Sequence, residues 1–357
     1  MKAEKDIKTG KWLIQYRYTD WQGIRKKSTK RGFNTKREAE EWLRNFLTTQ
    51  QADLNMGFED FIKLYYDDIS PRIRKNTLLS KQNMISSKIM PYFKNKNVSE
   101  IKPSDIRKWQ NQLISQGYAP TYLRTINNQL TAIFNFAVKY YDLKNNPCSK
   151  AGTMGKNQAD EMNFWTKEEF SKFIDAVMDK YMSYMGFMIL FWTGLRIGEL
   201  LALTVDDINL ANKTISVSKS LQRIEGEDII TPPKTPKSIR TVSIPNFLAD
   251  SLEMYISHIY NAKGKSRLFP VTKHYFEKEI TRGCKISGVK KIRLHDLRHS
   301  HCALLFEMGI SPLEVADRLG HERVETTLNT YAHLYPNKQK QISDKLNKIY
   351  EEGLECQ

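Results

Sequence analysis

Cysteine is scarce in this sequence, and long apolar runs are missing. Four cysteines occur among the 357 residues, at Cys148, Cys284, Cys302 and Cys356, and none belongs to a Cys-x-x-Cys pair. Their scatter argues against a zinc site and against a disulfide framework, and it fits a reducing compartment. The longest apolar stretch, 185–192, is too short to cross a bilayer, and no basic segment followed by an apolar one opens the chain. We therefore expect neither a membrane span nor a secretory signal.

Acidic residues are also few relative to basic ones. Lysine and arginine number 56 against 40 aspartates and glutamates, which gives a formal net charge of +16. Such an excess suits a polyanion such as nucleic acid. Hydrophobic residues make up 40% of the chain and aromatic residues 11%, enough to build folded cores. The length indicates two or three domains.

Residues 1–55 are predicted to form a small β-plus-α module. Apolar and polar residues alternate as in a half-buried strand, with the apolar positions at Trp12, Ile14, Tyr16 and Tyr18. The segment 21–23 reads as a turn. Thr35 and Glu38 then form a capping box, which predicts a helix through Trp42 and Phe46.

A basic run follows the predicted turn. Its charged members are Arg25, Lys26, Lys27, Lys30 and Arg31. A small sheet that carries such residues can lie in a DNA groove, and it can equally present a solvated charged face. The sequence of this module alone leaves both alternatives open.

Residues 56–148 are predicted to be all-helical. Apolar residues recur at helical spacing around Phe58 and Tyr65, and again after Pro103-Ser104, where Ser104 is expected to cap a helix. The longest helix should run from Pro120 to about Tyr141. Candidate phosphate contacts in this module are Arg72, Arg74, Lys75, Lys81 and Arg124.

Residues 149–162 lack periodicity and contain two glycines, which predicts a linker. Residues 163–357 should then form a mainly helical domain that opens with a capping box at Thr166 and Glu169. Three β-rich stretches predict a small antiparallel sheet within it: Thr214–Val217, Ile229–Thr231 and Arg240–Ile244.

Six residues of this last domain form a set with a definite chemistry. They are Arg196, Lys234, His295, Arg298, His321 and Tyr331. A tyrosine that cleaves a phosphodiester must lose its proton, the non-bridging oxygens need cationic donors, and the leaving 5′ oxygen needs a proton. Arginine suits the oxygens because its planar fork donates bidentate hydrogen bonds. Histidine exchanges protons near neutral pH, and a lysine whose pKa is lowered can serve as the acid.

The motifs around these residues resemble those of the tyrosine recombinase, or phage integrase, family. They are Gly194-Leu195-Arg196-Ile197-Gly198-Glu199-Leu200, Pro233-Lys234-Thr235-Pro236-Lys237-Ser238-Ile239-Arg240, His295-Asp296-Leu297-Arg298-His299, Leu319-Gly320-His321 and Thr330-Tyr331-Ala332-His333. The resemblance covers the whole chain. It implies an arm-type DNA-binding domain at 1–55, a helical core-binding domain at 56–148 and a mainly α catalytic domain with a small antiparallel sheet at 163–357, as in lambda-like and conjugative-transposon integrases.

The resemblance also implies a mechanism and partners. Tyr331 would form a 3′-phosphotyrosine, with Arg196, Arg298 and His321 on the phosphate, Lys234 and His295 moving protons, and Glu199 as an orienting partner. No metal or cofactor is expected. The partners would be double-stranded DNA at core and arm attachment sites, three further copies in a homotetramer on a Holliday junction, and host DNA-bending and excision-directionality proteins. The place of action would be the cytoplasm of a bacterial cell, at the nucleoid.

Some alternatives stay open. Lys237 competes with Lys234 for the acid role, although Lys234 alone fits the Lys-Thr-x-x-Ser-x-Arg phrase of the family. A DNA-binding regulator with an inactive recombinase fold would lack the tyrosine or an arginine, and both are present. A type IB topoisomerase would share the chemistry but rejoin the same strand. An apolar stripe in the tail predicts docking on a neighbouring copy, through Ile342, Leu346, Ile349, Tyr350 and Leu354.

Overall fold

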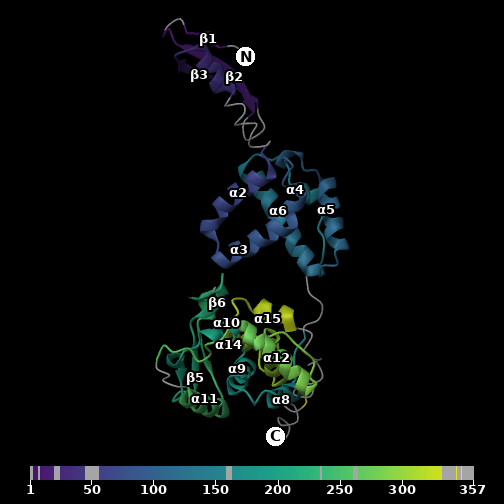
Figure 1. Ribbon diagram of the computed structural model, residues 1–357, viewed down its shortest axis with the longest axis vertical. Helices are drawn as coiled ribbons and strands as arrows, with labels where there is room; N and C mark the ends of the chain where they lie inside the picture. Colours follow the sequence, from purple (N-terminus) through teal and green to yellow (C-terminus); the bar gives the residue numbers. More distant parts are fainter. Residues whose placement is uncertain are drawn as a thin grey trace, which may run out of the picture. The chain divides into compact units, whose positions relative to one another are not determined.

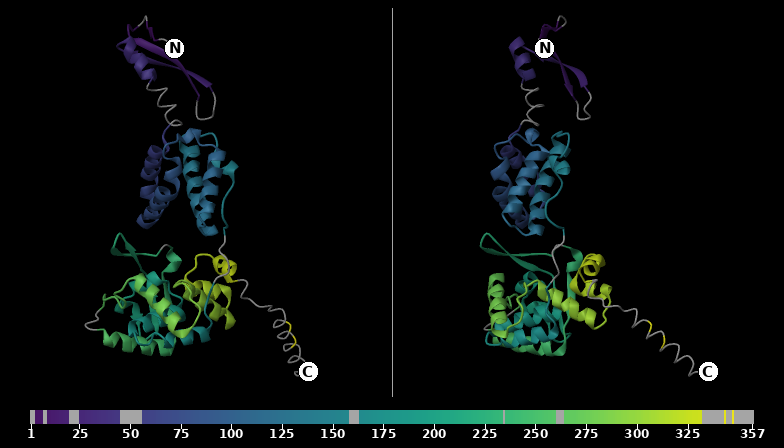
Figure 2. Two further views of the ribbon diagram at one scale, coloured as in Figure 1. Left: turned by 45° about the vertical axis from the view of Figure 1, so that its right-hand side comes forward. Right: turned by 90° about the vertical axis from the view of Figure 1, so that its right-hand side faces the viewer.

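The structure, a computed structural model, describes residues 3–6, 9–19, 25–44, 56–157, 163–233, 235–259 and 264–331, with two single positions, 343 and 347. At residues 18, 19, 25, 26, 326 and 329–331 it describes the backbone alone. The chain divides into two compact units, Met1–Asp160 and Glu161–Gln357 (Figures 1 and 2). Mainly helical units with small antiparallel sheets confirm the expected fold class.

The first unit begins with a three-stranded antiparallel sheet in the order β1-β2-β3. Its strands are β1 (Glu4–Lys5), β2 (Trp12–Thr19) and β3 (Arg25–Phe33). Ile14 and Tyr16 are buried under the helix that begins at residue 36, which confirms the predicted alternation. The cap is confirmed as well, since Glu38 N donates to Thr35 Oγ1 at 3.1 Å. The expected turn at 21–23 and Phe46 lie outside the described residues.

A helical module follows in the same unit. Its elements are α2 (Phe58–Ile69), α3 (Lys75–Met84), a π-helical turn (Ile85–Ile89), α4 (Met90–Phe93), α5 (Pro103–Ser115), α6 (Pro120–Tyr140) and α7 (Pro147–Ala151). The predicted long helix is confirmed as α6, whose buried face meets Phe58, Phe93 and Trp109 in one core. A helix with one apolar stripe buries that stripe against its neighbours, which is how these short helices are stabilised.

The expected cap at Ser104 is wrong. Helix α5 begins at Pro103, and its cap position is Lys102, two residues before Ser104. Proline suits the first helical position because its missing N–H would have no partner there. The side chain of Asp105 supplies the cap instead, since it accepts a hydrogen bond from Lys102 N at 2.9 Å and one from Lys96 Nζ at 2.8 Å.

The stretch expected to be a linker, 149–162, is partly folded onto the helical module. Cys148, Ala151 and Met154 are buried in the helical core. Gly155 packs so closely on α6 that a Cβ atom there would lie 2.0 Å from the Pro120 carbonyl oxygen. Composition misled the prediction, because glycine here permits close backbone approach rather than flexibility.

The second unit is built around helices. They are α8 (Lys167–Asp175), α9 (Tyr181–Thr193), α10 (Ile197–Ala202), α11 (Asn246–His258), α12 (Lys273–Ser287), α13 (Asp296–Glu307), α14 (Pro312–Leu319) and α15 (Val324–Tyr331). The apolar helix α9 is buried along most of its length. The predicted capping box of α8 is confirmed, since Glu169 N donates to Thr166 Oγ1 at 3.3 Å and Thr166 N donates to the Glu169 carboxylate at 2.9 Å.

The three predicted strands of this unit exist, but they do not form one sheet. Strands β4 (Ile208–Asn209), β5 (Thr214–Val217) and β8 (Arg240–Ser243) make one antiparallel sheet. Strand β7 (Glu227–Thr231) instead pairs with β6 (Ser220–Ile224), which the sequence prediction missed. Glu225 and Gly226 join them with φ of 53° and 90°. Two consecutive positive φ angles are typical of a type I′ hairpin turn, so Gly226 was the available signal.

No helix in the described part of the chain is long and apolar enough to cross a membrane.

The close packing of Gly155 predicts a large effect of a single methyl group. Gly155→Ala should destabilise the helical module by about 2–4 kcal/mol, because a left-handed backbone angle disfavours alanine and the Cβ would meet backbone atoms. Gly117→Ala is the matched control, since Gly117 has a similar φ of +72° with open space around it, against +76° at Gly155. Hydrogen exchange of the α6 amides, measured by mass spectrometry, should accelerate more in Gly155→Ala. Equal acceleration in both variants would show that the close packing adds nothing.

Candidate active site

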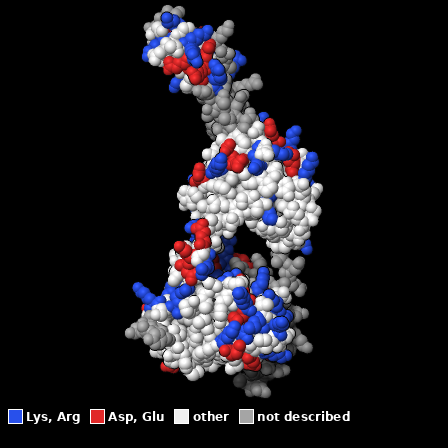
Figure 3. All heavy atoms as spheres, in the orientation of Figure 1, with Lys and Arg blue, Asp and Glu red and all other residues white. Residues whose placement is uncertain are grey.

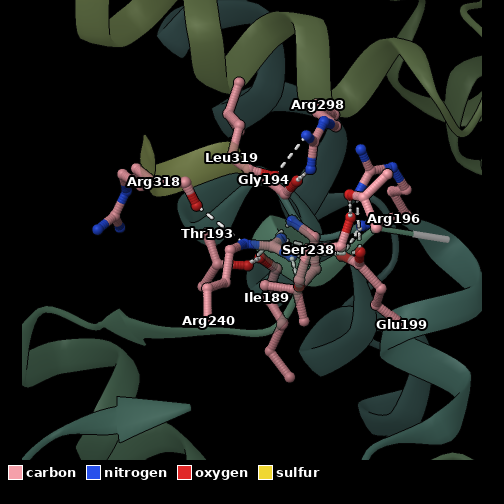
Figure 4. A network of polar contacts seen from close by, with 12 residues as sticks. Ile189, Thr193, Gly194, Arg196, Glu199, Ser238, Arg240, Arg298, Arg318 and Leu319 are labelled. Atoms are coloured by element: carbon pink, nitrogen blue, oxygen red, sulfur yellow. Dashed lines mark hydrogen bonds and ion pairs between the residues drawn. The ribbon is translucent and has the colours of Figure 1, made fainter. Parts of the chain in front are cut away.

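Arg298 is the more deeply buried of the two predicted arginines. It lies in the first turn of α13 and is 2% exposed. Its Nη1 donates to the Gly194 carbonyl at 2.9 Å and its Nη2 donates to the Leu319 carbonyl at 2.6 Å (Figure 4). These carbonyls lie at the C-terminal ends of α9 and α14, where helix carbonyls lack intrahelical partners and the helix dipole favours a cation.

Two glycines make this arrangement possible. Gly194 and Gly320 end α9 and α14 in the left-handed conformation, with φ of 67° and 68°. A Cβ atom on Gly194 would lie 2.6 Å from Leu319 and 2.7 Å from His301, so any other residue would push the two helix ends apart. The Gly-Leu-Arg and Leu-Gly-His motifs therefore meet where Gly194 approaches the Leu319 side chain.

Arg196 lies at the start of α10 and is oriented by Glu199. The Arg196 backbone N–H donates to Glu199 Oε2 at 2.9 Å, and Arg196 Nη1 donates to Glu199 Oε1 at 2.8 Å. The Arg196 side chain is 36% exposed, whereas that of Glu199 is 3% exposed. Burial alone would raise the pKa of Glu199, but hydrogen bonds and charge from Arg240 and Arg196 hold this pKa below its ordinary value. Glu199 is therefore a carboxylate at neutral pH.

The two predicted histidines respond electrostatically to the same arginines. His295 immediately precedes α13, and burial, then Arg298 and Arg196, lowers its pKa. His321 follows Gly320, and its Nδ1 lies 2.8 Å from Thr327 Oγ1 on α15. Burial, then Arg298, Arg196 and Arg240, lowers the pKa of His321 to about 3. Both rings are neutral at pH 7, so each can accept a proton or a hydrogen bond at one nitrogen.

Two other histidines, His299 and His301, lie nearby. The ring of His299 contacts that of His295 edge-on at 5.0 Å, and burial, then His295, lowers the pKa of His299 to about 4. His301 is buried and accepts a hydrogen bond from Arg318 Nε at 3.1 Å. Burial, then Arg318, lowers the pKa of His301 to about 3.

The structure describes less of the remaining two members. Lys234 lies outside the described residues. The turn that follows it folds as a short 3-10 helix, Pro236–Ser238, and the Lys237 carbonyl oxygen would lie 2.9 Å from a Cβ atom on Gly320. Tyr331 is the last residue of α15 and is described by its backbone alone. Helix α15 packs against α14, which brings the tyrosine segment to the His321 side of the site.

Sequence reasoning missed Arg240 as a member of this site. Its guanidinium donates to both oxygens of Glu199, at 3.2 and 3.0 Å, and to the carbonyls of Ser238 and Arg318, at 3.1 and 3.0 Å. The available signal was its place at the end of the Lys-Thr-x-x-Ser-x-Arg phrase.

The basic run of the first module is split between the two faces of its sheet. The β2–β3 register places Lys27 opposite Arg17 and Lys30 opposite Ile14. Lys27 therefore shares the open face with Arg17, while Lys30 lies on the helix-covered side, 5.8 Å from the centre of the Trp42 ring. The same register places Arg25 and Arg31 with Lys27, and Lys26 with Lys30. Figure 3 shows lysine and arginine interspersed with acidic side chains on the visible face of this module. Arg17 was missed because it stands alone between tyrosines.

The candidate phosphate contacts of the helical module differ in environment. Arg72 is exposed and pairs with Asp68 at 2.8 Å. Lys81 donates to Gln129 Oε1 at 2.7 Å, and burial lowers its pKa. Arg74 and Lys75 lie at the start of α3. The Nε of Arg124 is buried and has no hydrogen-bond partner among the residues that the structure describes. Arg72, Arg74 and Lys75 are thus exposed, whereas Lys81 is partly buried.

Three family models match the chain in succession. "Arm DNA-binding domain" matches residues 3–50, "Phage integrase, N-terminal SAM-like domain" matches 57–114 and "Phage integrase family" matches 163–338. The chain is 34% identical over 328 residues to the ICEBs1 integrase of Bacillus subtilis, covering 87% of this chain and 89% of the relative.

Solved structures share the fold. The Tn1549 transposon integrase in complex with a circular intermediate DNA matches with a TM-score of 0.68 at 22% identity, over 80% of this chain and 99% of that one. A lambda integrase tetramer bound to a Holliday junction matches with a TM-score of 0.59 at 18% identity, over 88% and 94%.

Because these buried histidines are neutral in the folded state, the free energy of unfolding of the second unit should fall as the pH is lowered. His301 has a pKa of about 3 when folded, against 6.5 for an ordinary histidine. Below pH 6.5 the unfolded chain takes up a proton that the folded chain does not, so this residue alone should lower the free energy of unfolding by up to about 1.4 kcal/mol per pH unit. We expect the second unit to unfold at lower urea concentration at about pH 5 than at about pH 7.5.

The control for this prediction uses two variants. His301→Gln keeps an acceptor for Arg318 but cannot take up a proton, so its stability should depend less on pH. His274→Gln removes a histidine whose side chain is 68% exposed and should behave as wild type. An unchanged pH dependence in His301→Gln would contradict the prediction.

Proposed function

The chain belongs to the phage integrase family and is a site-specific tyrosine recombinase, and from this premise we propose that Tyr331 is the nucleophile that cleaves the crossover strand. The phenolic oxygen bonds to phosphorus as the bond to the 5′ oxygen breaks, which leaves a 3′-phosphotyrosine and a free 5′ hydroxyl. The 5′ hydroxyl of a partner duplex then attacks the phosphotyrosine and releases the tyrosine. The bond energy stays in the covalent intermediate, so exchange needs no external energy source.

The arginines bind the phosphate. Arg196 uses one Nη on Glu199 and is the more exposed of the two, so its remaining N–H groups are available to a non-bridging oxygen. Arg298 is fixed by two carbonyls before DNA arrives, so it loses little freedom in the transition state. The single observation that carries the proposal is the junction at Arg298, whose guanidinium binds the carbonyls of Gly194 and Leu319. It joins the Gly-Leu-Arg, His-x-x-Arg and Leu-Gly-His motifs.

The histidines handle protons and hydrogen bonds. His295 is neutral at pH 7 and can accept the proton of Tyr331 as the phenol attacks. His321 is neutral as well, and with Nδ1 on Thr327 its Nε2 can donate a hydrogen bond to a phosphate oxygen. Lys234 is assigned the proton transfer to the leaving 5′ oxygen.

The first unit provides the DNA-binding modules. We assign arm-site binding to residues 1–55 through Arg17, Arg25, Lys27 and Arg31 on the open face of the sheet, with Lys26 and Lys30 on the other face. The helical module is assigned the crossover site.

Integration and excision of a mobile element fit this arrangement of domains, since the ICEBs1 and Tn1549 proteins are integrases. Three further expectations stay predictions: a tetramer held by tail docking, host bending and directionality proteins, and action at the bacterial nucleoid. The five apolar tail positions named for docking lie outside the described residues.

A nicked suicide substrate tests the nucleophile. Its short 5′ fragment diffuses away after cleavage and traps the covalent intermediate, so wild-type protein should give a protein–DNA adduct that resists denaturing gel electrophoresis. Tyr331→Phe should give none, because phenylalanine has no hydroxyl. Tyr335→Phe, which changes a tyrosine four residues further on, is the matched control and should retain the adduct. Adduct in Tyr331→Phe would refute the assignment, and adduct without exchange between two duplexes would favour topoisomerase-like rejoining.

A sulfur substitution separates Lys234 from Lys237. Lys234→Ala should slow cleavage by about 10²- to 10⁴-fold on an ordinary substrate, as expected when a general acid is removed. A substrate whose 5′-bridging oxygen is sulfur releases a thiolate that needs no proton, so the Lys234→Ala rate should recover on it. Lys237→Ala should cleave both substrates as wild type does. Sulfur rescue of Lys237→Ala rather than Lys234→Ala would move the acid to Lys237.

A further inference from the structure

Glu199 is shared by two arginines, although one would satisfy it. Its Oε1 accepts from Arg196 Nη1 and Arg240 Nη1, and its Oε2 accepts from the Arg196 backbone and Arg240 Nη2 (Figure 4). Arg240 is 7% exposed and is buried beside the carboxylate, whereas the Arg196 side chain is 36% exposed. A buried carboxylate requires compensation, but the capping role of Glu199 needs only one partner.

The charges around the site show what the second arginine contributes. Arg196 and Arg298 are the two cations assigned to the phosphate, and Glu199 lies 2.8 Å from one of them. Without Arg240, the carboxylate would cancel much of the Arg196 charge. With Arg240 present, the three guanidinium groups and Glu199 leave two net positive charges. The other buried carboxylate nearby, Asp296, is matched separately by Arg293 at 2.8 Å.

This net charge matters for the reaction. A phosphodiester carries one negative charge, and a second develops as the phenolate oxygen adds to phosphorus. Positive charge that is already in place, and that exceeds the single negative charge of the ground-state phosphodiester, stabilises the transition state more than the ground state. The geometry points to Arg240 as a positioning residue that neutralises Glu199, so that Glu199 can hold Arg196 in place without cancelling its charge. This inference rests on the proposed function.

Arg240 also joins the parts of the site that lie far apart in sequence. Its guanidinium reaches the carbonyl of Ser238, in the turn that follows Lys234, and that of Arg318, at the end of α14. A Cβ atom on Gly320 would lie 3.0 Å from Arg240 Cδ, so the side chain packs directly beneath the residue before His321. Figure 4 shows the Arg318 guanidinium directed away from Glu199. Arg240, rather than Arg318, therefore compensates the negative charge of Glu199.

The test measures single-turnover adduct formation on the suicide substrate at saturating protein. A direct oxyanion donor contributes about 10²- to 10³-fold, so an indirect one should contribute less, and Arg240→Gln should slow cleavage roughly 10- to 100-fold. Its DNA affinity should stay close to wild type, because Arg240 is buried. The decisive variant is the double substitution Arg240→Gln with Glu199→Gln, in which the uncompensated carboxylate is gone. It should cleave several-fold faster than Arg240→Gln, since glutamine still caps α10.

Each other outcome has a definite meaning. A double variant as slow as Arg240→Gln, or slower, would overturn the inference, as would a wild-type rate in Arg240→Gln. Absence of adduct in the wild type would count against the proposed function instead. Thermal unfolding of each variant monitors the fold. If Arg240→Gln does not fold, Arg240→Lys decides, because it keeps the positive charge. A rate of adduct formation within about tenfold of wild type supports the inference. A rate as low as that of Arg196→Ala overturns it.

Discussion

The site depends on a buried guanidinium held by the ends of two helices. Moving a cation out of water costs several kcal/mol, and Arg298 offsets this with carbonyls that α9 and α14 cannot use internally. The carbonyls come from Gly194 and Leu319, so one side chain fixes segments that are distant in sequence. Everything else in the site is placed relative to this junction: Arg196 follows the first carbonyl, and His321 follows the second. Together with burial, which is the larger cause, the same charge lowers the pKa of His295 and His321.

Local signals in the sequence predicted a good part of this architecture. The helix cap at Thr35, the capping box at Thr166, the long helix α6 and the alternating strand β2 all follow from short-range preferences, and the structure contains each of them. The ordered motifs likewise gave the candidate site, because their residue types match the charges and protons that phosphodiester cleavage requires.

What the sequence could not provide depends on tertiary contact. Strand β7 was found, but its partner was misassigned, because pairing follows a tight turn at Gly226 rather than composition. Gly155 looked like part of a flexible linker until its contact with α6 was visible. Arg240 looked like one strand residue among many, since its importance comes from partners 41 and 78 residues away. The basic run of β3 looked continuous, although the pleat divides it between two faces.

The crowding of guanidinium groups has a consequence for when the site becomes competent. In the absence of DNA, burial and then the neighbouring arginines lower the pKa of His295 and His321, so both rings are neutral. A phosphate that binds the arginine pair weakens the local positive potential and so raises the proton affinity of both rings. Proton uptake and substrate engagement are thus thermodynamically linked, and each favours the other.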